Sequence, residues 1–182
     1  MRPNEFITSD THFGHKNIIK YSNRPFVDKW EMDKELIRRW NEKVPERGAI
    51  VYHLGDFMFG RSGRAHEILN QLNGTIRFMK GNHDKPLEGV WHRFDWARDY
   101  YESRTPDGVK VVMCHYPIAS WNGMHRGAWQ LHGHCHGTFP DTGVRRIDVG
   151  VDTHPNYEPY SYEELVEIMR DRGYVPVDHH GD

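Results

Sequence analysis

The chain has 182 residues, enough to bury a hydrophobic core without disulfides and few enough to form one domain. Its 26 acidic and 24 basic residues nearly cancel, which argues against an overall basic field that binds nucleic acid or anionic membranes non-specifically. Two cysteines, Cys114 and Cys135, are too few for a disulfide scaffold, and we expect both to be reduced.

Short runs rich in β-branched and aromatic residues predict strands along the chain. These runs cover residues 6–10, 49–56, 75–84, 109–115, 128–134 and 145–152. No run reaches the roughly 18 apolar residues of a membrane span, and the amino terminus has no apolar leader, so we expect a cytoplasmic protein without membrane contact. In the polar ending "DHHGD", His179 and His180 are not expected to bind metal.

Apolar residues near a 3.6-residue period predict helices over 28–44, 63–73 and 161–173. In the last of these, Ser161 and Glu164 have the spacing of a capping box. The aromatic residues Trp30 and Trp40 are expected to pack into the core. The whole pattern indicates one layered α/β domain over residues 1–182.

Polar clusters follow five of the predicted strands. In chain order they read "SDTHFGH", "LGDFMFG", "KGNHDK", "CHYP" and "LHGHCHG". Loops beyond the carboxyl ends of strands converge on one crevice in open α/β sheets, so these separated clusters are expected to meet. In the last cluster, histidines at alternate positions project to one side of an extended chain, and glycine lets the backbone approach a bound ion.

The side chains of these clusters are typical ligands of divalent metals. The chain holds 14 histidines, where average composition gives about four. Mixed nitrogen and oxygen ligands suit Mn²⁺, Fe²⁺, Ni²⁺, Co²⁺ or Zn²⁺ and disfavour a closed structural zinc site. Six to eight candidates exceed what one ion needs. Two ions about 3.5–4 Å apart, bridged by a carboxylate and a water, would use them all.

The blocks "DTH", "GD", "GNHD", "H" and "GHCH", in this order between about residues 5 and 152, resemble the calcineurin-like metallophosphoesterase family. The stretches "SDTHFGHKNII" and "YSNRPF" further resemble small bacterial and phage members. The resemblance implies a two-sheet β sandwich flanked by helices on both faces, the four-layer αββα fold. The strand and helix pattern alone does not distinguish this fold from a single doubly wound sheet.

The resemblance also implies a set of site residues. The first ion would be held by Asp10, His12 and His136, and the second by Asn82, His115 and His134. Asp56 would bridge the two ions. His83 would face the scissile phosphate, oriented by Asp84, and these two would form the catalytic pair. His132 precedes the matching block and would support the strand or contact a metal-binding residue from behind.

The activity that the resemblance implies is metal-dependent hydrolysis of phosphodiester bonds by a hydroxide that bridges two ions, with Mn²⁺ as the expected metal. The substrate would be a small phosphoester or a nucleotide, including cyclic nucleotides, or a nucleic-acid end. A phosphomonoesterase or nucleotide pyrophosphatase with the same site is the alternative. A catalytically idle protein-binding scaffold is a further reading, against which the presence of His83 argues.

Three further candidates follow the block "DTH" in the chain. His15 follows it closely and would contact substrate or belong to a solvated loop. Asn23 and Arg24 would bind substrate or serve the structure, since arginine suits bidentate phosphate recognition. His53 lies within an apolar run and is interpreted as a hydrogen-bonded core histidine.

Overall fold

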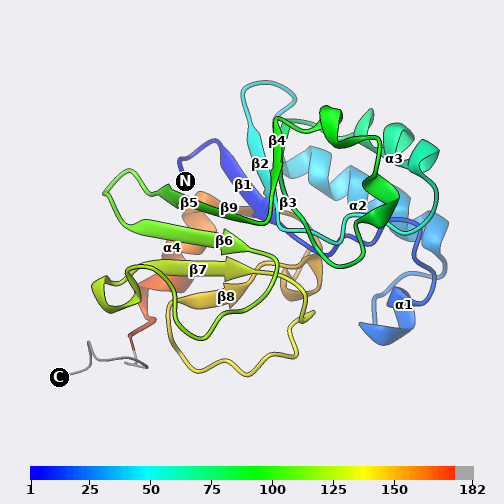
Figure 1. Ribbon diagram of the computed structural model, residues 1–182. Coiled ribbons are helices and arrows are strands. Elements are labelled where there is room, and N and C mark those ends of the chain that lie inside the picture. The colour runs from blue at the N-terminus through cyan, green and yellow to red at the C-terminus, as the bar shows by residue number, and fades with distance from the viewer. Residues whose placement is uncertain (175–182) are drawn as a thin grey trace.

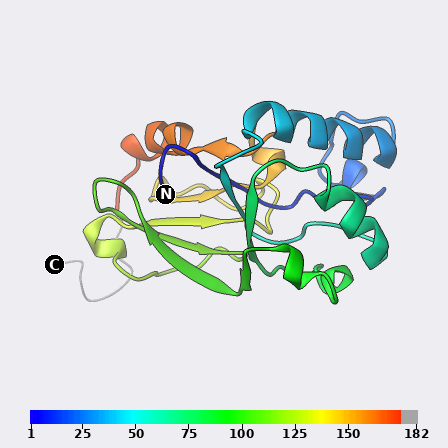
Figure 2. The ribbon, with the colours of Figure 1, turned by 90° about the horizontal axis from the view of Figure 1, so that it is seen from above.

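The computed structural model describes residues 1–174, so His179 and His180 lie outside the described part. Two β-sheets pack face to face (Figures 1 and 2). The first sheet has the order β4-β3-β2-β1-β9 and the second the order β5-β6-β7-β8. This arrangement confirms the predicted sandwich and excludes a single doubly wound sheet.

The strands that lead to the polar clusters are mostly parallel. The first sheet comprises β1 (Glu5–Thr8), β2 (Ile50–His53), β3 (Thr75–Met79), β4 (Trp96–Arg98) and β9 (Tyr160–Ser161), with only β9 antiparallel to its neighbour. The second comprises β5 (Tyr100–Arg104), β6 (Lys110–Cys114), β7 (Trp129–His132) and β8 (Arg146–Asp148), with β5 antiparallel to β6. Strands β4, β5 and β9 were not predicted, because they are short and half polar.

Helices α2 (Lys29–Lys43) and α3 (Ser62–Leu69) pack on the outer face of the first sheet (Figure 2). The described residues also form α1 (Ile18–Tyr21), α4 (Tyr162–Arg170) and the 3₁₀ turns η1 (Lys85–Leu87), η2 (Trp91–Arg93), η3 (Met124–Arg126) and η4 (Val151–Thr153). The predicted capping box of Ser161 and Glu164 starts α4. The Oδ1 of Asp28 caps α2 by accepting hydrogen bonds from the backbone N–H groups of Trp30 and Glu31, at 2.8 and 2.9 Å.

Successive side chains of a strand point to opposite faces of its sheet, so the apolar residues pack in separate layers. In β1, Phe6 faces α2 and α3, whereas Ile7 faces the space between the sheets, where Leu165 of α4 also packs. On the outer face of the second sheet, Val112 is covered by the segment around η3, including Met124. Both sheets are therefore covered on both faces, and no helix of the described part is long and apolar enough to cross a membrane.

One prediction for the core is wrong. Trp40 is buried as expected, but Trp30 is 60 % exposed at the start of α2. The ring lies under two cations, with Lys29 Nζ 4.6 Å and Arg64 Cζ 5.6 Å from its centroid. The apolar period includes Trp30, but the buried face of α2 is formed by Met32, Leu36 and Trp40, and the side chain of Trp30 lies outside it.

The loops that follow the parallel strands pair with one another. The N–H of Asp10 donates to the carbonyl of Gly55 at 2.9 Å, and that of His12 donates to Asp56 at 3.0 Å. A bridge between Ser9 and Gly150 links the two sheets at the same edge. In Figure 1, β6 and β7 point toward the side of the molecule that carries α1. The carboxyl ends of both sheets thus open on one site.

Candidate metal centre

The structure brings the predicted ligands together in two neighbouring clusters. We define the first cluster as Asp10, His12 and His136, and the second cluster as Asp56, His115 and His134 with Asn82. In each three-residue set of Asp and His, one ligand atom per residue lies within 4.8 Å of the others. Asn82 joins the second cluster because its Oδ1 lies 3.0 Å from the Nε2 of His115. Residues up to 126 positions apart, from Asp10 to His136, therefore share one site.

Asp56 lies between the two clusters. Its Oδ2 is 3.6 Å from the Nε2 of His12 and 3.6 Å from the Nε2 of His115. Its Oδ1 accepts a hydrogen bond from the backbone N–H of His83 at 2.8 Å, which fixes the carboxylate plane. One carboxylate oxygen of Asp56 thus faces a histidine of each cluster.

Several buried atoms of the first cluster have no hydrogen-bond partner among residues 1–174. They are the Oδ1 of Asp10 and both ring nitrogens of His12. Burial raises the pKa of Asp10, while burial and then the neighbouring His136 lower the pKa of His12, so the imidazole is neutral and its nitrogen can ligate. Buried polar atoms are normally paired, and a divalent cation would satisfy these. The residues present fit such an ion.

Five of the seven predicted ligands adopt left-handed backbone angles. Their φ values are 55° for Asp10, 50° for His12, 56° for Asp56, 72° for His134 and 49° for His136. Among residues with a Cβ, Asp and His enter this region more readily than most, although the conformation remains uncommon. Such strain persists only where surrounding contacts over-determine it, and it is concentrated at functional sites.

Two motif glycines permit the ligand carboxylates to approach the backbone closely. A Cβ at Gly81 would overlap the Oδ1 of Asp56 and lie 2.7 Å from its backbone nitrogen. A Cβ at Gly133 would overlap the Oδ2 of Asp10 and the Oγ of Ser9. These positions explain why glycine precedes Asn82 and His134 in the motifs: any larger residue would displace a carboxylate.

Asp152 is a residue of the site that the motifs did not reveal. Its Oδ2 lies 2.7 Å from the Nδ1 of His136 and leaves the Nε2 of that ring for the first cluster. Burial opposes ionisation of Asp152, but hydrogen bonds from His136 and Arg24 hold its pKa below the ordinary value. Its position at the end of the last predicted strand was the one available signal.

The contacts of Arg24 are those of the structural role that the sequence left open. The side chain is buried, and its Nε and Nη2 donate to the two carboxylate oxygens of Asp152 at 2.7 and 2.8 Å. Its guanidinium also donates to the carbonyls of Thr11 at 2.9 Å and Asp10 at 2.7 Å. With these partners Arg24 supports the loop of the first cluster from behind and does not reach the cleft.

The hydrogen-bond partners of Asp84 differ from the expected one, the ring of His83. Its buried carboxylate accepts hydrogen bonds from the backbone N–H groups of Asp56 and Phe57 at 2.9 Å each and of Gly81 at 2.6 Å. None of its hydrogen bonds in the described part goes to the ring of His83. Asp84 therefore holds the loop of Asp56 against the loop of His83, and the structure does not support its predicted role in orienting the His83 ring.

His83 and His15 line the same open cleft as the clusters, which has a volume of about 640 Å³. The exposed ring of His83 lies 5.6 Å from the ring of His12, and that of His15 lies 5.4 Å from it. Asn23 is exposed and does not belong to the lining of this cleft. His53 is a core residue as predicted: its Nε2 lies 3.0 Å from the Oγ1 of Thr11.

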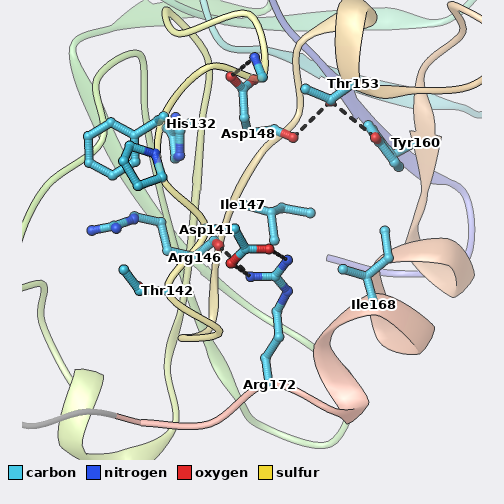
Figure 3. A pocket seen from close by; sticks show the side chains of 13 residues that line it. His132, Asp141, Thr142, Arg146, Ile147, Asp148, Thr153, Tyr160, Ile168 and Arg172 are labelled. Carbon is cyan, nitrogen blue, oxygen red and sulfur yellow. Dashed lines mark hydrogen bonds and ion pairs between the residues drawn. The ribbon is translucent and has the colours of Figure 1, made fainter.

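A smaller pocket of about 250 Å³ lies behind the loop that carries His134 and His136 (Figure 3). His132 faces this pocket and is buried, so the third histidine of "LHGHCHG" stands outside both clusters. Arg172 forms two contacts with the carboxylate of Asp141, at 2.8 and 2.7 Å, and so ties the loop to the segment after α4. This ion pair, and the hydrogen bond from the N–H of Gly137 to the Oδ2 of Asp148 at 3.0 Å, brace the loop.

No protein-family model matches the chain. The gene 66 protein of Mycobacterium phage L5 is 26 % identical over 181 residues, covering 82 % of this chain and 86 % of the phage protein. The crystal structure of the protein of unknown function AQ665 from Aquifex aeolicus superimposes with a TM-score of 0.72 at 23 % identity, covering 90 % of this chain and 98 % of that one. This likeness shows a shared fold.

The uncharacterized protein MJ1445 of Methanocaldococcus jannaschii is 35 % identical over 171 residues, and the alignment covers 90 % of each chain. An identity of this extent over nearly the whole of both chains shows that they are related. The chain belongs to the same protein family as MJ1445.

Proposed function

We propose that the protein is a metal-dependent phosphoesterase that hydrolyses phosphodiester bonds with two divalent ions, Mn²⁺ being the first choice. The observation that carries the proposal is the position of Asp56, whose Oδ2 lies 3.6 Å from a histidine nitrogen of each cluster. A carboxylate shared by two sets of nitrogen and oxygen ligands is the arrangement of two-metal hydrolytic sites. The motif resemblance described above points the same way.

The residues of the two clusters would have separate roles in metal binding. The first cluster would hold one ion and the second cluster the other, with Asp56 shared between them. When bound, the pair of ions supplies Lewis-acid activation of water and neutralises charge on the phosphoryl oxygens. Asp152 and Arg24 would keep the Nε2 of His136 directed at the first ion, because they fix the ring through its Nδ1.

His83 is the proposed acid of the reaction. It is exposed in the cleft beside His12 and takes no part in either cluster, so its ring remains free to meet the substrate. From this position it would donate a proton to the leaving oxygen or a hydrogen bond to the phosphoryl group. Asp84 would act only through the backbone, by holding the loop that carries His83.

A hydrolysis panel tests the proposal. Protein stripped with a chelator is reconstituted separately with Mn²⁺, Fe²⁺, Ni²⁺, Co²⁺ and Zn²⁺ and assayed on bis-p-nitrophenyl phosphate and p-nitrophenyl phosphate. The assay is extended to 2′,3′- and 3′,5′-cyclic nucleotides, with stripped protein as the control. We expect metal-dependent hydrolysis with the diester preferred.

The other outcomes decide between the alternatives. Preference for the monoester would overturn the diesterase proposal in favour of a phosphomonoesterase. Inactivity with every metal and every ester, in protein shown by metal analysis to be loaded, would overturn the enzymatic proposal and favour a binding scaffold.

A further inference from the structure

We propose that the cleft beside the metal clusters binds the planar base of a nucleotide ester on a shelf of three aromatic side chains. The aromatic shelf consists of His15, Tyr21 and Phe59. The inference rests on the proposed function, because the metal clusters define where the phosphate lies. It adds a substrate class, short nucleotide phosphoesters, and the residues that would select it.

The aromatic shelf exposes large apolar rings that the core does not use. Tyr21 is 75 % exposed and Phe59 is 49 % exposed, and both line the cleft that contains His12 and His83. The rings of His15 and Phe59 are stacked at 4.4 Å and 16°, and Tyr21 meets His15 edge-on at 6.4 Å. Exposed aromatic groups gathered in a cleft mark a binding surface.

The backbone under the aromatic shelf is firmly held. The N–H of Phe59 donates to the carbonyl of Phe13 at 2.8 Å, and that of Gly14 donates to the buried Asp33 at 2.7 Å. Gly14 has a φ of 77°, and a Cβ there would lie 2.8 Å from the carbonyl oxygen of Phe59. The stacked rings therefore stand on a rigid support, which lowers the entropic cost of binding a flat group.

The position of His83 indicates which part of the ester meets the aromatic shelf. Its ring lies 5.6 Å from that of His12 and 6.4 Å from that of Phe59, so it adjoins both the first cluster and the Phe59 ring of the shelf. A group that departs toward His83 would lie against Phe59. We therefore place the nucleoside on the leaving side of the scissile bond, with His83 beside the leaving oxygen.

The charge of the cleft favours a short substrate. Its described lining comprises histidines, aromatic and aliphatic residues, Ser22, Cys135 and Thr138, without a lysine or arginine. A long polyanion is held by a track of basic side chains along its backbone, and stacking alone suits one or two bases. The aromatic shelf thus fits a nucleotide or dinucleotide ester better than the interior of a long strand.

The test compares binding of two substrate-like anions, each with its phosphate joined to the leaving-side sugar, to manganese-loaded protein by calorimetry: adenosine 5′-monophosphate, and ribose 5-phosphate, which lacks the base. Because a base gains affinity by stacking on an aromatic side chain, we expect the nucleotide to bind about tenfold more tightly. Phe59→Ala should remove most of this advantage and leave ribose 5-phosphate within about twofold, whereas Phe59→Trp should keep the advantage. Trp30→Ala, which removes an exposed ring outside the cleft, is the matched control and should change neither constant.

Equal affinity of the unaltered protein for the two anions would overturn the proposal that the aromatic shelf binds a base. An equal loss of affinity for both anions in Phe59→Ala would also overturn it. A nucleotide advantage that depends on Phe59 in a protein inactive on all esters would support the aromatic shelf while the proposed hydrolysis fails. Assays with a dinucleotide and an oligonucleotide of the same bases distinguish a short substrate from a long strand. The dinucleotide should be the better substrate, and clear preference for the oligonucleotide would contradict the short-substrate assignment.

Discussion

The carboxylate of Asp152 lies 2.7 Å from the Nδ1 of His136, and this contact determines which nitrogen of the ring faces the first cluster. Burial alone would lower the pKa of His136, but the hydrogen bond to Asp152 raises it above the ordinary value. A carboxylate behind a ligating histidine fixes the tautomer and strengthens the ligand. The pair therefore belongs to the machinery of the first cluster, although Asp152 holds no metal in the proposed site.

Asp152→Asn should weaken binding at the first cluster by about 10- to 100-fold, because the histidine loses its charged partner. Calorimetric titration with Mn²⁺ measures this loss, and the second cluster should keep its affinity. Asp95→Asn, at a surface ion pair with Arg77, is the matched control. Two ions bound to Asp152→Asn with unaltered affinity would contradict the role given to Asp152.

Asp56→Asn should reduce the metal content from about two ions to about one or fewer per chain, because the shared negative charge disappears. Elemental analysis after dialysis measures the content, and circular dichroism checks that the variant is folded. The amide can still accept the hydrogen bond from the N–H of His83. If Asp56→Asn retained two tightly held ions, the shared position of this carboxylate would have no function in metal binding.

His83→Gln should bind both ions normally and lose about 10²- to 10⁴-fold in kcat, the usual size of a general-acid contribution. The exposed ring can be replaced without disturbing the backbone N–H that donates to Asp56. Steady-state kinetics on the preferred ester, together with metal analysis of the same sample, make the measurement. Unaltered turnover would remove His83 from the mechanism.

The ion cluster of Lys43, Glu158 and Glu164 provides a pH test of stability outside the site. Lys43 Nζ lies 2.8 Å from Glu164 and 3.0 Å from Glu158, so this cation already occupies the group formed by His154 and the two glutamates. Burial opposes ionisation of Glu164, but hydrogen bonds from Lys43 and the N–H of Ser161 lower its pKa from 4.5 to about 2. The folded protein thus releases this proton more readily than the unfolded chain.

Glu164→Gln should lower the free energy of unfolding at pH 7 by about 0.5–1 kcal/mol, a value that allows for the partial exposure of the pair. Glutamine can still complete the capping box with Ser161, so the loss reports the charge. The difference from the unaltered protein should be full above pH 4.5 and vanish as the pH falls through about 2. Urea unfolding at both ends of this range measures it.

Glu167→Gln is the matched control for the stability test, because Glu167 pairs with Arg170 on the exposed side of the same helix. It should change the free energy of unfolding very little at either pH. A deficit in Glu164→Gln that stayed constant down to pH 2 would show that packing, and not charge, accounts for it.

The cluster residues could be predicted because each follows a strand-forming run and because their motifs resemble those of the metallophosphoesterase family. Asp10 and His12 follow β1, and His134 and His136 follow β7, with the glycines that the close approach of Asp56 and Asp10 requires. Strand ends of parallel sheets meet at one edge, so the order of the motifs was sufficient to predict their convergence.

Contacts between distant side chains could not be predicted in this way. Arg24 and Asp152 are 128 residues apart, and no pattern of spacing relates them. Asp84 was expected to orient a neighbouring ring, but its carboxylate turns to three backbone donors that only the folded loops bring within reach. Trp30 fits the apolar period of α2 and yet has no layer to cover it.

The sequence by itself therefore predicted the residues of the two clusters, the glycines beside them and six strand-forming runs, because the tendency to form a strand or a tight turn depends on near neighbours in the chain. The tertiary structure decided that the strands form two sheets, that Arg24 and Asp152 lie behind the clusters, and that His15, Tyr21 and Phe59 gather in one cleft. Those relations depend on how the loops of separate strands pack, and packing distances are set only when both sheets have come together.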